Sequence, residues 1–229
     1  MSSQSIDRVE IKLKAKSILE GNWPISIGVI LIYFLFTVLL DHFIGFLGVF
    51  GLILNVLITP ALILALMTFF VKSAKSNLFS FTHMKINFKM YFKMLIFVFL
   101  LSLFYIPQLF LFVLFFNTSS FLWIIISIII IAFNVYLSLA LFSVPFILIE
   151  SNGEKSLIDS VKESYNLTKG HVINLFVFSL SFLGWQIVCI FSLCIGFLWL
   201  IPYVYVAEYL YFKKLQNIKF SEIDSIKLD

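Results

Sequence analysis

The sequence predicts an all-α, polytopic membrane protein with six transmembrane helices, and three observations predict it. Hydrophobic residues make up 62% of the 229 residues and charged residues only 12%, against about 25% charged residues in soluble domains. All 16 Lys and Arg residues fall in four short islands, residues 8–16, 72–93, 155–169 and 213–227. The stretches between the islands run 55, 61 and 43 residues. One helical crossing of the hydrocarbon takes roughly 20 residues, so each stretch fits two crossings.

Two crossings per stretch bring every cationic island back to the same side of the membrane. Cytoplasmic loops carry the excess of Lys and Arg, so we expect this side to be cytoplasmic and both termini to lie there. The crossings and their connections occupy residues 1–214, which we expect to form one membrane domain. Residues 215–229 are expected to form a polar, mobile cytoplasmic tail.

The cations also indicate what the protein binds. They flank apolar runs and have no interleaved polar face that would follow phosphates, so the net charge of +4 does not indicate a nucleic-acid partner. We expect them to bind the anionic headgroups of the lipid bilayer. Five side chains beside the first and last crossings are of the types that anchor a protein in the membrane interface: Trp23, Tyr209, Tyr211, Lys213 and Lys214.

The chain begins with a predicted helix over residues 11–20, in which apolar residues recur at i, i+4, i+7 and i+8 from Ile11. Lysines flank that apolar face, so we expect the helix to lie in the cytoplasmic interface and to end at Gly21. The first crossing follows at residues 23–40. Asp41 and His42 then interrupt the apolar run, and we place the first outer turn there.

The second crossing is predicted at residues 52–71. In the basic island that follows, Phe81, Met84, Phe88 and Tyr91 keep a helical period, which predicts a second interfacial helix. The third crossing is expected at residues 94–116, a polar turn at 117–120 and the fourth crossing at 121–149.

The third basic island contains another predicted interfacial helix. Leu157, Ile158, Val161 and Tyr165 line its apolar face, and Ser156 is placed to form a capping box with Asp159. An amphipathic helix followed by a hydrophobic hairpin thus occurs three times along the chain. The alternatives are a true internal repeat, with three hairpins about one axis, and a pattern that any multi-pass protein needs.

The last apolar run, residues 172–212, would be about 60 Å long as one helix, twice the thickness of the hydrocarbon. We therefore expect it to fold into crossings at 172–191 and 196–212, with a turn around 192–196. Cys189 and Cys194 lie near this turn, and we expect small apolar packing residues there rather than a disulfide.

Four segments of the chain resemble a known family. They are "EGNWPISIG", "TPALILALMTFFVKSAKSNLFSFTHM", "SLIDSVKESYNLTKGH" and "LSFLGWQIV…IGFLWLIPYVYVAEYLYFKKL". Together they resemble the bacterial integral-membrane family known as domain of unknown function 975. More distantly, the chain is similar to the membrane domains of some bacterial glycerophosphodiester phosphodiesterases. It departs from the family pattern at Ala61 or Leu62, where a Gly is expected, and at Lys75 and Ser76 in place of Arg-Gly. The resemblance implies a bacterial plasma-membrane protein and supplies no catalytic residues.

Glu208 is the one charged residue within the last apolar run, and charges in hydrocarbon are functional candidates because they are costly. We regard it as a candidate for substrate or proton coupling. The alternative is a structural role, in which Glu208 reaches the cytoplasmic boundary or pairs with Lys213 or Lys214.

Buried amides and prolines form two further sets of candidates. Five amides are expected to form hydrogen bonds between helices, with a substrate path as the alternative: Asn55, Gln108, Asn134, Asn174 and Gln186. Four prolines are candidate hinges, although proline is ordinary in membrane helices: Pro60, Pro107, Pro145 and Pro202.

The sequence contains no paired carboxylates in apolar runs, no Ser, His and Asp set, no zinc motif and no phosphate-binding loop. We therefore expect neither an enzyme nor a bound cofactor or metal. The leading hypothesis is a non-enzymatic accessory or envelope-maintenance factor that contacts another membrane or cytoplasmic protein. The alternatives are a small transporter or export component for a lipid, peptide or amphiphile, and an intramembrane enzyme with few charges.

Overall fold

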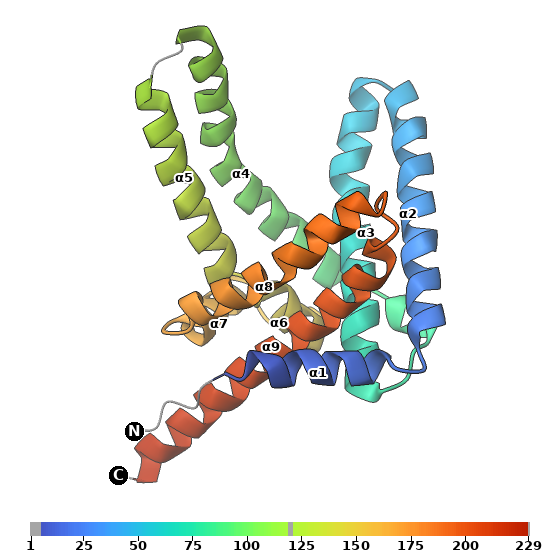
Figure 1. Cartoon of the computed structure of the whole chain (residues 1–229), viewed down its shortest axis with the longest axis vertical. Coiled ribbons are helices and arrows are strands. Elements are labelled where there is room, and N and C mark those ends of the chain that lie inside the picture. Colours follow the sequence, from blue (N-terminus) through green and yellow to red (C-terminus); the bar gives the residue numbers. More distant parts are fainter. Residues whose placement is uncertain (1–5, 119–120, 229) are drawn as a thin grey trace.

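The computed structural model describes residues 6–118 and 121–228, and every regular element in this part of the chain is a helix. The all-α prediction is confirmed. The helices, shown in Figure 1, are α1 (Arg8–Leu19), α2 (Trp23–Phe46), α3 (Val49–Ser76), the short 3-10 helix η1 (Phe81–Met84), α4 (Phe88–Thr118), α5 (Phe121–Ala140), α6 (Val144–Glu150), α7 (Leu157–Thr168), α8 (Val172–Phe191) and α9 (Phe197–Leu228).

Five segments of the described residues are long and apolar enough to cross a membrane, and they correspond to the first five predicted crossings. They are Trp23–Phe46, Val49–Ser76, Phe88–Gln108, Leu122–Glu150 and Val172–Phe191. The expected sixth crossing, residues 196–212, stays a prediction. It forms the first part of α9, whose apolar start is followed by Glu208, Lys213 and Lys214.

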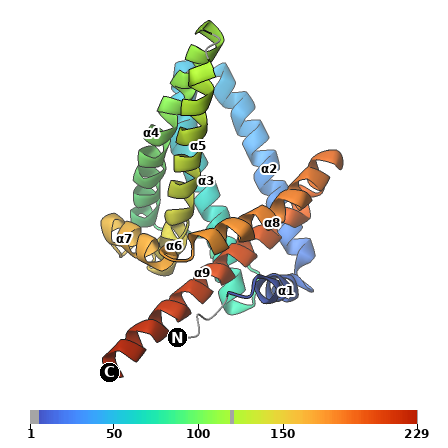
Figure 2. The same cartoon turned by 60° about the vertical axis from the view of Figure 1, so that its left-hand side comes forward.

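Two hairpins, α2–α3 and α4–α5, rise from the same end of the molecule (Figure 1). The two termini, α1 and α7 all lie away from the hairpin tips, and Figure 2 shows the same arrangement after rotation. The basic islands fall on α1, on the region from the end of α3 to the start of α4, on α7 with the residues that flank it, and on the later part of α9. We call this end of the molecule the basic end.

The third hairpin, α8–α9, does not repeat the other two, because it runs at a slant beneath them (Figure 1). Its predicted turn is present between Phe191 and Phe197. A cavity of about 520 Å³ is lined by Ser192 and Gly196 of this turn together with Lys16 of α1 and Trp23 of α2. The turn therefore lies beside the junction of α1 and α2, and three equivalent hairpins about one axis are not present.

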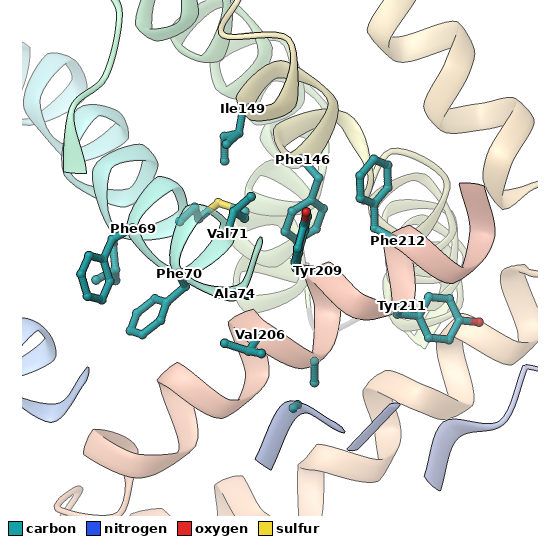
Figure 3. Close-up of a cluster of buried hydrophobic side chains, with 14 of the residues drawn as sticks. Phe69, Phe70, Val71, Ala74, Phe146, Ile149, Val206, Tyr209, Tyr211 and Phe212 are labelled. Carbon is teal, nitrogen blue, oxygen red and sulfur yellow. The ribbon is translucent and has the colours of Figure 1, made fainter. Parts of the chain in front are cut away.

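Helix α9 is at the centre of the core and packs against α1, α2, α3, α7 and α8. Figure 3 shows its buried aromatic residues beside those of α3 and α6. Phe212 stacks on Phe146 of α6 at 5.5 Å between ring centroids, and Tyr211 lies 4.7 Å from Phe178 of α8. Successive residues of α9 thus contact different helices, so one helix organises the whole core.

The predicted first helix is confirmed as α1, and it begins with a side-chain cap. The Asp7 carboxylate accepts hydrogen bonds from the backbone N–H groups of Val9 and Glu10, which have no partner within the helix. Ile11, Ala15 and Leu19 are buried, as their period predicts. The apolar face of α1 is therefore covered mainly by the protein itself, chiefly by α9.

The predicted fourth crossing is interrupted after Ala140, where proline begins the short helix α6. Hydroxyl groups of α7 satisfy the backbone groups that the interruption leaves free. Ser164 Oγ donates to the Ala140 carbonyl at 3.0 Å and accepts from the Ser143 N–H at 3.2 Å. Thr168 Oγ1 donates to the same carbonyl at 3.0 Å. All four residues are buried, so these bonds join α5, α6 and α7.

Two predicted boundaries are wrong. Asp41 and His42 do not form the first outer turn but lie inside α2, which continues to Phe46, and the turn falls at residues 47–48. Asn55 of α3 donates a hydrogen bond to Asp41 at 3.0 Å, so this carboxylate has a partner without breaking the helix. Residues 81–91 do not form one interfacial helix, because Lys85 is extended and separates η1 from the start of α4.

Two further expectations are corrected. The buried residues of α7 are Ser160, Ser164, Leu167 and Thr168. Of the predicted apolar face, Leu157 and Val161 pack against the core, but Ile158 and Tyr165 are turned outward, 65% and 45% exposed. The predicted capping bond at Ser156 is absent. The predicted polar tail from residue 215 onward is not separate from the last helix, since α9 continues to Leu228 and projects beyond the other helices (Figures 1 and 2), and its mobility stays a prediction. Residues 119 and 120 of the predicted turn lie outside the described residues.

Gly153 follows α6 with φ of +74°, a conformation that favours glycine. A Cβ atom at this position would lie 2.6 Å from the backbone nitrogen of Met90 in α4. Gly153 therefore permits the close approach of the α6–α7 turn to the start of α4.

We expect Gly153→Ala to lower the free energy of unfolding by about 2 kcal/mol or more, from backbone strain plus the steric clash. The midpoint of thermal unfolding in detergent should fall by roughly 4–8 °C. The control is Gly45→Ala, since Gly45 lies within α2 and has open space around its Cβ position. Equal midpoints for the two variants would contradict the close approach at Gly153.

Candidate functional site

The basic end is held together by contacts between islands that are distant in sequence. The Lys93 ammonium of α4 donates to the backbone carbonyls of Gly153 at 2.6 Å and Lys155 at 2.8 Å. Lys89 forms an exposed ion pair with Glu154 at 3.3 Å. The second and third islands are therefore fixed against each other by hydrogen bonds that the sequence did not indicate.

A second contact joins α6 to α9. Lys213 forms an ion pair with Glu150 at 2.7 Å, and the Tyr209 hydroxyl donates to the same carboxylate at 3.1 Å. Lys213 also donates to Gln216 at 2.9 Å. Glu150 ends the long apolar segment from Leu122, so this cluster marks where that segment meets the basic end.

The predicted anchors divide into two groups. Tyr209 and Tyr211 are 3% and 0% exposed, so they belong to the core and the prediction that they anchor the protein in the interface is wrong. Their helical position alone did not show that α3, α6 and α8 cover them. Trp23 and Lys214 are partly exposed and remain candidate anchors, whereas Lys213 is engaged by Glu150.

A groove of about 680 Å³ opens on the basic end between α1, α3 and α9. Its charged lining residues are Lys14 of α1, Lys75 of α3, Lys213 of α9 and the single carboxylate Glu20. Asn22 and Asn77 add amide groups. Cations outnumber anions in this groove, an arrangement that favours an anionic group such as a lipid phosphate.

Helix α1 is fixed on this end by a cation–π contact. The Lys12 ammonium lies 4.7 Å from the ring centroid of Phe182 in α8, and such contacts contribute about 0.5–1 kcal/mol at exposed sites. Burial and then the positive charge of Arg8 lower the pKa of Lys12 below its usual value. Lys12 therefore tethers α1 to α8, which explains one cation of the first island without any ligand.

Glu208 is partly buried on α9. The structural alternative was pairing with a nearby lysine, but Lys213 pairs with Glu150 instead. Within the described part of the chain Glu208 has no hydrogen bond or ion pair. Its role in substrate or proton coupling stays a prediction.

The amide side chains do not form the expected set of bonds between helices. Asn55 does, because it donates to Asp41 of α2 and accepts from Thr59 at 3.0 Å. Among the described contacts no hydrogen bond is found for the other four, so the expectation is wrong for them: Gln108, Asn134, Asn174 and Gln186.

Three of these amides instead line one cavity. Gln108 of α4, Asn134 of α5 and Gln186 of α8 border a space of about 430 Å³. Asn174 lies outside it and is exposed. We call this space the amide cavity.

Three hydroxyl groups that sequence reasoning missed also line the amide cavity: Tyr105, Ser138 and Ser179. The hydroxyls of Tyr105 and Ser138 lie 3.1 Å apart and connect α4 to α5. The signal available in the sequence was the presence of these polar residues in apolar runs. Nothing in their spacing showed that three helices would bring them together.

The candidate hinges differ in their surroundings. Helices α3, α4 and α9 continue through Pro60, Pro107 and Pro202, and Pro60 and Pro202 are buried. Only at Pro145 is the helix interrupted, and there the hydroxyls of α7 hold the interruption in place. A hinge role stays a prediction for each of them.

No group of three or more His, Cys, Asp and Glu side chains that could hold a metal ion occurs among the described residues. His83 Nδ1 lies 3.1 Å from Ser73 Oγ at the end of α3. Cys189 and Cys194 are both free, as expected, with Cys189 buried and Cys194 exposed.

The five segments that are long and apolar enough to cross a membrane define the class of this molecule: it is a multi-pass helical membrane protein. The family model described as "Protein of unknown function (DUF975)" matches residues 1–219, and the chain belongs to this family. The resemblance seen in its sequence is thereby confirmed, while the similarity to glycerophosphodiester phosphodiesterase membrane domains stays a prediction. No curated protein and no solved structure matches the chain.

We expect Lys213→Met to lower the free energy of unfolding by about 1 kcal/mol, because methionine keeps the packing of the stem but leaves Glu150 without its ion pair. The thermal midpoint should fall by roughly 2–4 °C. Lys214→Met is the matched control, since Lys213 and not Lys214 forms the ion pair with Glu150. If adding Glu150→Gln to Lys213→Met lowers the midpoint as much as it does in the wild type, the two side chains are not coupled.

Proposed function

We propose that the protein is a non-enzymatic accessory or envelope-maintenance factor of the bacterial plasma membrane, and that it acts through its basic end. The observation that supports this proposal is that all four cationic islands lie on one end of the fold, where Lys93 joins the second island to the third and Lys12 and Lys213 are held by Phe182 and Glu150. Both termini lie at that end, which we assign to the cytoplasm (Figure 1).

The basic end has the features of a surface that binds a membrane partner. Several of its lysines are held by contacts with the rest of the fold, Lys12 by Phe182, Lys93 by backbone carbonyls and Lys213 by Glu150, so these charges are held in place before binding. Large apolar side chains stand beside them in water-accessible positions, namely Val9 and Leu13 of α1 and Ile158 of α7. Cations next to exposed apolar groups suit anionic lipid headgroups and a membrane or cytoplasmic protein.

A second function, transport or export of a lipid, peptide or amphiphile, is favoured by the amide cavity and by Glu208, which has no described partner. Transport would use the amide cavity and Glu208, which lie within the apolar helices, whereas an accessory role would use the lysines of the basic end. The two functions therefore depend on different residues.

Complementation of a deletion strain separates these functions. Glu208→Gln, Pro60→Ala and Pro202→Ala alter groups that transport would use, and a double variant, Lys14→Gln with Lys75→Gln, removes two cations of the groove. For an accessory factor we expect the first three variants to restore growth in sublethal detergent and the lysine pair to fail. All must be compared at equal abundance in the membrane. Failure of Glu208→Gln with success of the lysine pair would favour transport.

The proposed orientation gives a separate prediction. Alkaline phosphatase fused after residue 47 or 118 should be active, because both positions are at hairpin tips outside the cytoplasm. A fusion after residue 153 should be inactive, since Gly153 lies at the basic end among lysines. A cytoplasmic signal at residue 118 would overturn the orientation and the assignment of the basic end to the cytoplasm.

A further inference from the structure

The amide cavity has the size and lining of a binding site. Its volume of about 430 Å³ falls within the range of about 300–1,000 Å³ that small-molecule sites occupy. Its polar groups come in pairs from the three helices around it: Tyr105 and Gln108 of α4, Asn134 and Ser138 of α5, and Ser179 and Gln186 of α8.

Two acceptor atoms of the cavity are buried without a partner. Asn134 is 6% exposed, and neither its Oδ1 atom nor the Oε1 atom of Gln108 has a hydrogen bond. A buried polar atom without a partner opposes folding, so such atoms are rare in native proteins unless water or a ligand satisfies them. Amide oxygens only accept hydrogen bonds. A partner that satisfies these two oxygens carries O–H or N–H donors.

The rest of the lining sets the charge and shape of that partner. None of the described residues that border the cavity is ionisable near neutral pH, so it offers no counterion to a charged group within apolar helices. Ile131, Leu139 and Leu180 supply an apolar wall. The partner therefore combines an uncharged head group with a hydrocarbon portion.

The position of the cavity indicates where its ligand comes from. Gln108 lies about ten residues before the end of α4 at Thr118, and Ile131 lies about ten residues after the start of α5 at Phe121. At 1.5 Å per residue these two residues lie about 15 Å below the hairpin tip, roughly half of the 30 Å hydrocarbon thickness, and the other lining residues of α4 and α5 lie deeper. A ligand at this depth reaches the site from the bilayer.

We propose that the amide cavity binds an uncharged amphiphile whose head group donates hydrogen bonds to Asn134 and Gln108. The 3.1 Å contact between Tyr105 and Ser138 borders the site and contains hydroxyls that either donate or accept. The site is distinct from the basic end, which selects anionic groups.

Photocrosslinking of the full-length protein in phosphatidylcholine vesicles tests this proposal. The probe is a diacylglycerol with a photoreactive acyl chain, since its free hydroxyl is an uncharged donor. We expect saturable labelling of peptides from α5 and α8 that unlabelled dioleoylglycerol suppresses. Its O-methyl ether, which lacks the donor, and dioleoylphosphatidic acid, which is charged, should compete at least about threefold more weakly. Equal competition by either lipid, or labelling that does not saturate, overturns the proposal.

Substitution of the acceptor distinguishes a ligand site from a structural amide. We expect Asn134→Leu to weaken labelling by about three- to tenfold and to keep or raise the thermal midpoint without probe, because it removes an unpaired buried atom. Asn174→Leu is the control, since this amide of α8 lies outside the cavity and should leave labelling unchanged. Gln108→Leu repeats the test should Asn134→Leu fail to fold. Undiminished labelling in the folded leucine variant overturns the proposal.

Discussion

The packing of α9 is the interaction on which the rest of the structure depends. Within the sixteen residues from Leu200 to Leu215 its side chains enter the core against α1, α2, α3, α6 and α8, and its tyrosines act there as hydrophobic residues (Figure 3). Hydrocarbon does not drive helices together, so close van der Waals contact must hold them. The stacked rings supply that contact: Phe146 on Phe212, and Phe70 on Tyr205 at 5.7 Å. The two long hairpins are attached to this centre only near their bases, which explains their divergence (Figure 1).

The polar groups of the fold form two sets, one paired and one unpaired. At the basic end they are paired: Lys213 with Glu150, Lys93 with backbone carbonyls, and Lys12 with the face of Phe182. In the amide cavity the acceptors of Asn134 and Gln108 are left unpaired. Pairing fixes the basic end as a rigid surface, and the lack of pairing gives the cavity its capacity to bind. The two proposals follow from this difference: the basic end binds a partner at the membrane surface, and the amide cavity binds a ligand within the apolar helices.

Much of the fold follows from physical limits that are visible in a sequence. The length of a crossing and the cost of moving lysine into hydrocarbon together predicted six crossings, of which five are found as long apolar segments, as well as the last turn and the grouping of the islands. Tertiary partners could not be predicted. Asn55 of α3 donates a hydrogen bond to Asp41 inside α2, and Glu150, 63 residues before Lys213, pairs with this lysine, which was one of the alternative partners of Glu208. The buried side of α7 was predicted wrongly because serine and threonine are usually solvent-exposed. Ser164 and Thr168 are instead buried and donate hydrogen bonds to the end of the interrupted helix α5. The amides were identified as unusual, but only the structure brings three of them to one cavity.

The interruption between α5 and α6 also has a mechanical consequence. Ser164 and Thr168 of α7 hold the Ala140 carbonyl, and Ala140 lies less than two helical turns from Asn134. The end of α5 is thereby hydrogen-bonded to α7, and the outer face of α7 carries the exposed Ile158 and Tyr165. These hydrogen bonds therefore couple the position of α7 at the basic end to one wall of the amide cavity. The Ala140 carbonyl is thus the point at which α7, on the surface of the protein, is connected to the helix that lines its internal cavity.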